Sequence, residues 1–169
     1  MGKRSGVNKI KLTSLLLEYL KDSSRTDRQM AKILGVSQPT ISRMRNRLLQ
    51  EGLVRHFSAI PDFAKLGYEI MVFSFVKFDM ERVMEIEEKA REWAQSYPEI
   101  IFSSRAEGMG MDTVTVSLHK NYAEFMNFLM ENKNRGRHFM AEVNYILVDL
   151  GGNVTKPLSF KYLAEKKEK

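Results

Sequence analysis

The 169-residue sequence contains no cysteine. This absence excludes disulfide bonds, thiolate zinc sites, iron–sulfur clusters and catalysis by a cysteine nucleophile. No apolar run approaches the roughly 18 residues that span a bilayer, and no signal-peptide core follows the basic start at residues 1–6. We therefore expect a cytoplasmic protein that has no contact with membranes and needs neither a metal ion nor a cofactor.

Acidic residues are scarce in the first part of the chain. Residues 1–67 hold 13 Lys and Arg against 5 Asp and Glu, a formal charge of +8. Residues 68–150 hold 9 against 14, a formal charge of −5, and residues 151–169 carry +3. The basic character belongs mainly to the N-terminal part, as expected when one module binds an anionic polymer and the other does not.

The most informative stretch is SQPTISRMRNRLLQE, at residues 37–51. Ser37 is a favourable N-cap, because its hydroxyl can accept a hydrogen bond from an unpaired backbone N–H of the first helical turn. Ile41, Met44 and Leu48 follow at i, i+3 and i+7, which predicts one apolar stripe. The opposite side of this predicted helix is polar and cationic.

A second predicted helix lies just upstream. Thr26 and Gln29 have the spacing of a capping box, and Gly35 can adopt the left-handed conformation that ends a helix. The side chains expected to be buried are Met30, Ala31, Ile33 and Leu34. The small Ala31, the glycine turn and the aliphatic Ile41 have the spacing of a helix-turn-helix. An ordinary helical hairpin with a solvated basic face is the alternative, but the capping box and glycine turn favour nucleic-acid binding.

A third helix over residues 7–21 would complete the core, with Ile10, Leu16, Leu17 and Leu20 facing the pair. Residues 52–60, GLVRHFSAI, have the strand character of a wing, in which Arg55 and His56 would lie along the phosphate backbone. The sequence therefore predicts a winged helix-turn-helix at residues 1–60, followed by a linker at residues 61–68.

The second half alternates between strands and helices. We predict strands at residues 70–78, 99–105, 112–118 and 141–150, and helices at residues 81–96 and 122–131. This βαββαβ order is that of a ferredoxin-like sandwich, here at residues 69–150, with helices on one face of an antiparallel sheet. The first strand is apolar on both faces, which indicates that its open face meets a partner sheet. Residues 151–169 form a C-terminal extension with strand character at residues 158–163. The predicted fold class is α+β.

These two modules together resemble the Lrp/AsnC, or feast/famine, family of bacterial and archaeal transcription regulators. The resemblance covers about residues 8–150 and is most specific in the run AKILGVSQPTISRMRNRLLQEGLVRHFSAIPDFAKLGYE. It implies a regulator that reads double-stranded DNA with the second helix of the motif. It also implies dimers formed through the open sheets, often assembled into tetramers or octamers, and a small-molecule effector such as an amino acid.

The resemblance and the residue chemistry together indicate the DNA-binding side chains. Arginine suits guanine, and asparagine or glutamine suits adenine, so the expected base contacts are Gln38, Ser42, Arg43 and Asn46. The expected phosphate contacts, which set register and affinity, are Ser37, Thr40, Arg47 and Arg55. Met44 and Arg45 are left out, because the family commonly has a cation at the first position and an aliphatic residue at the second.

The resemblance also implies an effector loop between the second and third strands. The family typically has glycine, one or two residues and then aspartate there, whereas this chain has the longer run GMGMD. The expected effector residues are Gly108, Gly110 and Asp112. A plain glycine hairpin is the alternative.

Two further functions stay open at this point. The same charge and oligomerisation would serve an architectural protein that coats DNA with little sequence preference. Haem-pathway decarboxylases also resemble this family and hold a tetrapyrrole with basic and histidine residues of the second domain. His119 and His138 are the histidines that this chain offers there.

Overall fold

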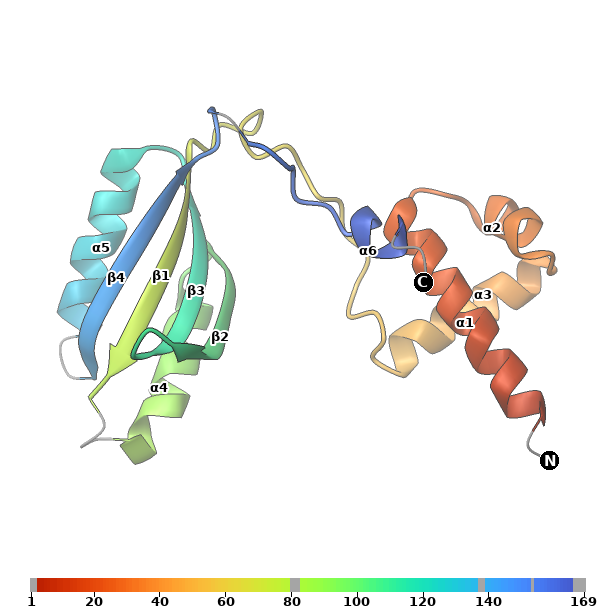
Figure 1. Cartoon of the computed structure of the whole chain (residues 1–169), viewed down its shortest axis with the longest axis horizontal. Helices are drawn as coiled ribbons and strands as arrows, with labels where there is room; N and C mark the ends of the chain where they lie inside the picture. Colours follow the sequence, from red (N-terminus) through yellow and green to blue (C-terminus); the bar gives the residue numbers. More distant parts are fainter. Residues whose placement is uncertain (1–2, 80–82, 137–138, 153, 166–169) are drawn as a thin grey trace. The chain divides into compact units, whose positions relative to one another are not determined.

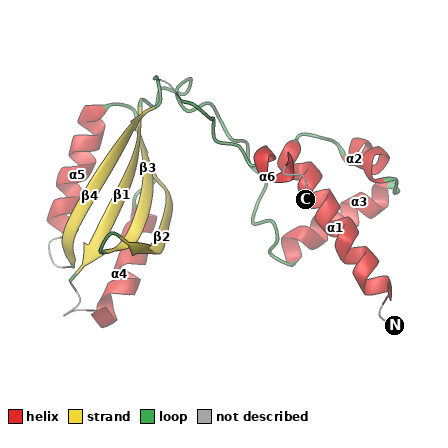
Figure 2. Cartoon of the chain, viewed as in Figure 1, coloured by secondary structure: helices red, strands yellow, loops and turns green. Residues whose placement is uncertain are grey.

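The computed structural model describes residues 3–79, 83–136, 139–152 and 154–165. The chain divides into two compact units (Figures 1 and 2). The first, called the N-terminal unit below, comprises Met1–Ile60 together with Pro157–Lys169. The second, called the sheet unit, comprises Pro61–Lys156. None of the described helices is long and apolar enough to cross a bilayer.

Three helices form the core of the N-terminal unit: α1 (Lys3–Lys21), α2 (Asp27–Leu34) and α3 (Gln38–Gln50). The buried side chains of this core are Leu12, Leu15, Tyr19, Met30, Ala31, Ile41 and Leu48. The α1 face was predicted incorrectly: Leu17 is 37% exposed, and of Leu16, Leu17 and Leu20 only Leu16 packs at the edge of the core. The side chain of Ile10, the fourth residue of the expected set, lies outside the described side chains. The leucines of α1 support two apolar stripes, and the core uses the stripe that includes Tyr19. Ile33, also expected inside, is 49% exposed.

The predicted wing strand is absent. Among the described residues of the N-terminal unit there are only helices and loops (Figure 2). A strand needs a partner for its ladder hydrogen bonds, and residues 52–60 have none. They are held instead by an N–H of Val54 that donates to Leu48 O at 3.0 Å, and by Phe57, whose ring packs edge-on against Tyr19.

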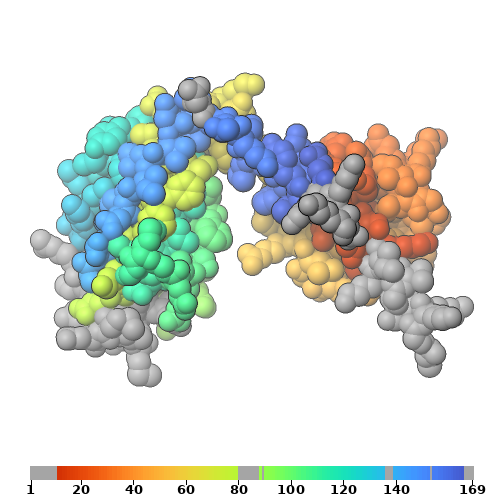
Figure 3. All heavy atoms as spheres, viewed as in Figure 1, coloured from red at the N-terminus to blue at the C-terminus, as the bar shows by residue number. Residues whose placement is uncertain are grey.

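The predicted strand at residues 158–163 is also wrong. The segment ends in a short helix, α6 (Lys161–Glu165), that packs on α1. The space-filling view shows its blue atoms against the red atoms of α1 (Figure 3). This part of the chain joins a unit without a described strand, so no sheet edge was present for it to extend.

The sheet unit contains β1 (Ile70–Phe78), α4 (Val83–Ser96), β2 (Ile100–Gly108), β3 (Met111–His119), α5 (Tyr122–Gly136) and β4 (Met140–Asp149). Its four strands are antiparallel in the order β2-β3-β1-β4. This is the predicted ferredoxin-like sandwich. The first two residues of the predicted 81–96 helix lie outside the described residues.

Both helices cover the same face of the sheet. The core between them and the sheet is formed by Val72, Tyr97, Phe125 and Phe128. Trp93 of α4 donates its indole N–H to the Asn132 Oδ1 of α5 at 2.9 Å, which ties the two helices together. The other face of the sheet carries no helix (Figure 1).

Candidate nucleic-acid interface

The turn between α2 and α3 is fixed by local hydrogen bonds. Thr26 and Gln29 form the predicted capping box: Thr26 Oγ1 accepts the Gln29 N–H at 3.3 Å, and Gln29 Oε1 accepts the Thr26 N–H at 2.8 Å. Gly35 ends α2 in the left-handed region, with φ at 60°. This conformation costs most residues about 1 kcal/mol or more, but glycine adopts it freely. The helix-turn-helix geometry follows from these local choices.

The inner side of α3 is anchored in the core. Ile41 and Leu48 are fully buried, and Met44 packs at the edge of the same cluster. Arg45 Nη1 forms an ion pair with Asp27 Oδ1 at 3.0 Å, so this arginine links α3 to the first turn of α2. The buried stripe and the ion pair together fix which side of α3 faces solvent.

The solvent side of α3 carries the residues predicted to contact bases. Gln38, Arg43 and Asn46 are exposed, and Ser42 is half-buried. The Arg43 guanidinium bends back along its own helix, donating to Pro39 O at 3.4 Å and to Thr40 Oγ1 at 3.5 Å. Both contacts are long, so this side chain can extend toward a ligand at little cost.

The predicted phosphate contacts differ in how they are held. Ser37 is the N-cap of α3, but its hydroxyl does not accept the expected backbone N–H; its Oγ lies 2.8 Å from Thr40 Oγ1 instead. Arg47 pairs with Glu51 Oε1 at 2.5 Å on the exposed helix end. Arg55 is exposed on the irregular segment after α3. The structure thus places seven of the eight predicted side chains on α3 or its N-cap.

A compact ion cluster supports the end of α1. Glu18 accepts hydrogen bonds from Lys21 at 2.5 Å and from Arg25 at 2.6 Å. The hydrogen bond from Lys21, helped by Arg25, holds the pKa of the Glu18 carboxyl below its usual range despite partial burial. Nearby, burial raises the pKa of the Tyr19 hydroxyl. Lys21 and Arg25 therefore serve the fold of this unit.

The predicted effector loop is a tight hairpin between β2 and β3. Gly108 pairs with Met111, which leaves Met109 and Gly110 as a two-residue loop with φ values of 52° and 71°. Two consecutive positive φ values are the mark of a type I′ turn. Asp112 Oδ2 accepts the Phe78 N–H at 2.9 Å, so this carboxylate joins the start of β3 to the end of β1.

His119 is enclosed rather than presented to a ligand. Its side chain is fully buried, its Nε2 lies 2.9 Å from Ser117 Oγ, and its ring packs on Phe125 and Phe128. Burial lowers the pKa of this imidazole from its ordinary value. His138 lies outside the described residues.

Comparisons with known proteins agree with this architecture. Residues 12–56 match the model of the bacterial regulatory protein arsR family, which covers the three-helix core. A regulator from Neisseria meningitidis, solved as an L-Met complex, superposes with a TM-score of 0.74 at 15% identity over 90% of this chain and 97% of its own. An AsnC family regulator from Agrobacterium tumefaciens gives 0.69 at 19% identity over the same shares. At these identities the likeness shows the fold.

A sequence relative decides the family. The HTH-type transcriptional regulator FL11 of Pyrococcus furiosus is 31% identical over 115 residues, which are 68% of this chain and 73% of that regulator. The chain belongs to the Lrp/AsnC family of transcriptional regulators. It is thus a DNA-binding regulator with a helix-turn-helix. Because its relatives are regulators and not enzymes, the comparisons contradict the decarboxylase alternative. Two further Pyrococcus regulators are matched over 55% and 64% of their length.

One group of candidate functional residues was not predicted from the sequence. Ala90, Arg91, Ala94 and Gln95 of α4 line a cleft against β2. The sequence feature that could have indicated this cleft is the pair of alanines one turn apart on α4, a helix expected to fill a core. Whether two alanines leave a cleft depends on which strand faces them, and the sequence does not show this.

Proposed function

We propose that the protein is a sequence-specific regulator whose two-fold dimer presents two α3 helices to successive major grooves, about one turn of the duplex apart. Its operators would then be inverted repeats. The observation that supports this best is the anchored orientation of α3. With Ile41 and Leu48 fully buried, the polar side bearing Gln38, Arg43 and Asn46 is turned to solvent on a rigid frame.

The roles within this surface follow from side-chain chemistry. Arg43 can donate two hydrogen bonds to the O6 and N7 of one guanine, and Asn46 or Gln38 can pair with adenine in the same bidentate way. Ser42 is a further base contact. Arg47 and Arg55, with the hydroxyls of Ser37 and Thr40, would hold phosphates and so set register without reading sequence.

Single substitutions test this division of roles. We expect Arg43→Ala to lose about 1–3 kcal/mol of discrimination at one base pair, because one bidentate contact is removed. Arg55→Ala should weaken binding to all duplexes about equally and lower the salt slope by about one. Fluorescence anisotropy on a selected operator, on single-base variants and on shuffled duplex would measure both effects.

Lys133→Ala on α5 is the matched control, since it removes an exposed cation from the sheet unit. This variant should bind operator and shuffled DNA as the parent protein does. If Arg43→Ala and Arg55→Ala lose the same factor on every duplex, the proposed division between base and phosphate contacts is wrong.

We further propose that the chains pair through the helix-free face of the sheet. Register places four apolar residues in one row across that face, from Phe102 of β2 through Val116 and Phe73 to Ile146 of β4. Phe102 is 53% exposed and Ile146 is 55% exposed. Such a row is typical of a surface that a second sheet covers. Dimers of this kind are the unit from which tetramers or octamers would form.

A small ligand is the remaining part of the proposal. The Neisseria regulator was solved with L-methionine, and this chain shares its fold. We propose that this protein also responds to a small molecule. Asp112 is the predicted effector residue that lines a cavity, whereas Gly108 and Gly110 shape the adjoining turn.

A further inference from the structure

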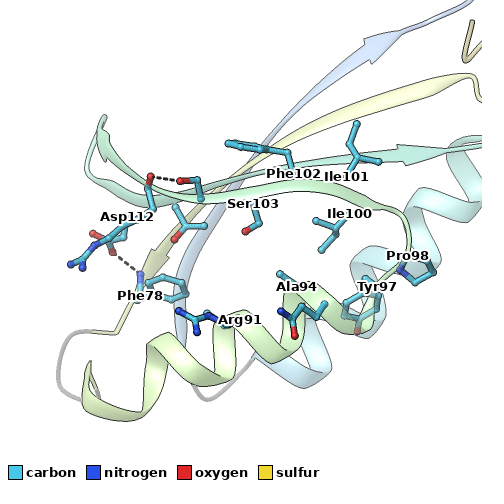
Figure 4. Close-up of a pocket in the computed structure, with 15 residues that line it drawn as sticks. Phe78, Arg91, Ala94, Tyr97, Pro98, Ile100, Ile101, Phe102, Ser103 and Asp112 are labelled. Carbon is cyan, nitrogen blue, oxygen red and sulfur yellow. Dashed lines mark hydrogen bonds between the residues drawn. The ribbon is translucent and has the colours of Figure 1, made fainter. Parts of the chain in front are cut away.

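The sheet unit contains an open cleft between α4 and β2. Its volume is about 710 Å³, within the roughly 300–1,000 Å³ typical of small-molecule sites. Figure 4 shows Ala94 of α4 facing the cleft from below, with Ile100 and Ser103 of β2 pointing toward the helix from above. Phe102 points away, toward the other face of the sheet.

The cleft is open because the facing side chains are small. Ala90 and Ala94 stand one turn apart on α4, and Ser103 and Thr113 face them from the sheet. Under α5, by contrast, the same layer is filled by large aromatic residues, including Phe125 and Phe128. A close-packed interior has few voids larger than a water molecule. We therefore attribute this gap to the small side chains at these positions of α4 and the sheet.

The lining is apolar along one side and cationic at its border. Phe78, Tyr97 and Ile100 supply carbon surface. Arg91, from the helix, is exposed and forms no ion pair with the described residues. The carboxylate of Asp112 is already engaged by the Phe78 N–H. A guanidinium beside an apolar hollow fits a ligand with one carboxylate and an apolar body.

We propose that this cleft binds a small monocarboxylate, with its charged end on Arg91 and its apolar body against Phe78, Tyr97 and Ile100. The site lies beside the glycine turn rather than in it. A ligand held there would fix β2, the edge strand, against α4. The inference that this binding regulates the protein rests on the proposed DNA-binding function, whereas the binding itself does not.

Titration calorimetry on the full chain tests the site, with 3-phenylpropionate as the probe and its neutral amide as the comparison. We expect the acid to bind and the amide to bind roughly tenfold more weakly or not at all, because the charged hydrogen bond is lost. Arg91→Gln should weaken the binding of the acid by a similar factor. Ala94→Leu should abolish binding by filling the cleft while leaving the thermal midpoint of the free protein unchanged or raised. Lys133→Gln on α5 should bind as the parent does.

Any of three results would overturn the proposed site: equal affinity for the acid and the amide, unchanged binding of the acid by Ala94→Leu, or no binding of the acid at millimolar concentration. The regulatory part is read separately, by anisotropy on operator DNA with and without the acid. If the ligand-free protein does not bind operator DNA, the proposed function is refuted, but the proposed carboxylate site is not affected. DNA binding that the bound acid does not change would refute the regulation alone.

Discussion

His119 is a buried base at the end of β3 in the sheet unit. Its Nε2 lies beside Ser117 Oγ, its ring packs between two phenylalanines, and its Nδ1 has no hydrogen-bond partner among the described residues. Burial lowers the pKa of the imidazole more than the negative charges of Glu124 and Glu99 raise it. The neutral ring therefore belongs to the folded state.

This burial gives the stability of the sheet unit a pH dependence. In the unfolded chain the ring titrates near pH 6.5, so below that pH the unfolded state binds more protons than the folded state. The free energy of unfolding should therefore fall as the pH drops from 6.5 toward the lowered native pKa, by up to about 1.4 kcal/mol per pH unit. Urea unfolding followed by the fluorescence of Trp93, the single tryptophan, measures it.

His119→Gln is the matched variant, since it removes the titrating group and keeps a polar side chain. Its free energy of unfolding should be lower at neutral pH but flatter between pH 6.5 and pH 5. A slope equal to that of the parent protein would show that other groups carry the pH dependence.

Among single residues, the local structure was predicted correctly where the interacting partner is near in sequence. Thr26, Gln29 and Gly35 were identified because a capping box and a left-handed turn depend on spacings of a few residues. The hydroxyl of Ser37 was misassigned, because Thr40 competes with the backbone for it. The burial of His119 depends on α5, which packs on it from another part of the chain.

At the scale of elements, the sequence predicted every strand of the sheet, with β1 matching its bounds residue for residue. Alternating apolar residues indicate a strand only when a partner edge is present. Residues 52–60 and 158–163 show such residues but belong to the helical unit, and both failed for that reason. The cleft between α4 and β2 escaped prediction because no local pattern reports the apposition of two distant elements.

The helix α6 is expected to contribute to the stability of the DNA-binding unit. Tyr162 and Ala164 are half-buried in this segment, which packs on α1. Truncation after residue 156 should lower the stability of the N-terminal unit by about 1–2 kcal/mol, the usual range for losing a partly buried apolar contact. Circular dichroism at a helical wavelength would report the helices of both units, and Trp93 fluorescence would report the sheet unit, so a loss of helix that Trp93 does not follow belongs to the N-terminal unit.

Truncation after residue 165 is the control, because it keeps the whole of α6. In the shorter variant, part of the circular-dichroism change should move to lower temperature, while the Trp93 transition stays in place. If both transitions stay in place, α6 contributes nothing to the fold of the unit it touches.

At the scale of the whole molecule, the exposed apolar row on the sheet predicts self-association. Ile146→Glu should place a charge in the covered interface and convert the dimer to a monomer, since an unpaired buried carboxylate is strongly disfavoured. Light scattering after size-exclusion chromatography measures the mass. Ile146→Val keeps the surface apolar and should stay dimeric; a variant Ile146→Glu that also stays dimeric would place the interface elsewhere.

We expect α3 to read the base sequence of the DNA, and the preference of the protein for its operator over other duplexes tests this directly. Duplexes would be selected from a random library, and the best would be compared with its shuffled counterpart by fluorescence anisotropy over several salt concentrations. We expect a preference of about a thousandfold or more that persists at physiological salt. Equal binding to both duplexes that weakens steeply with salt would contradict the claim and identify an architectural DNA-coating protein instead.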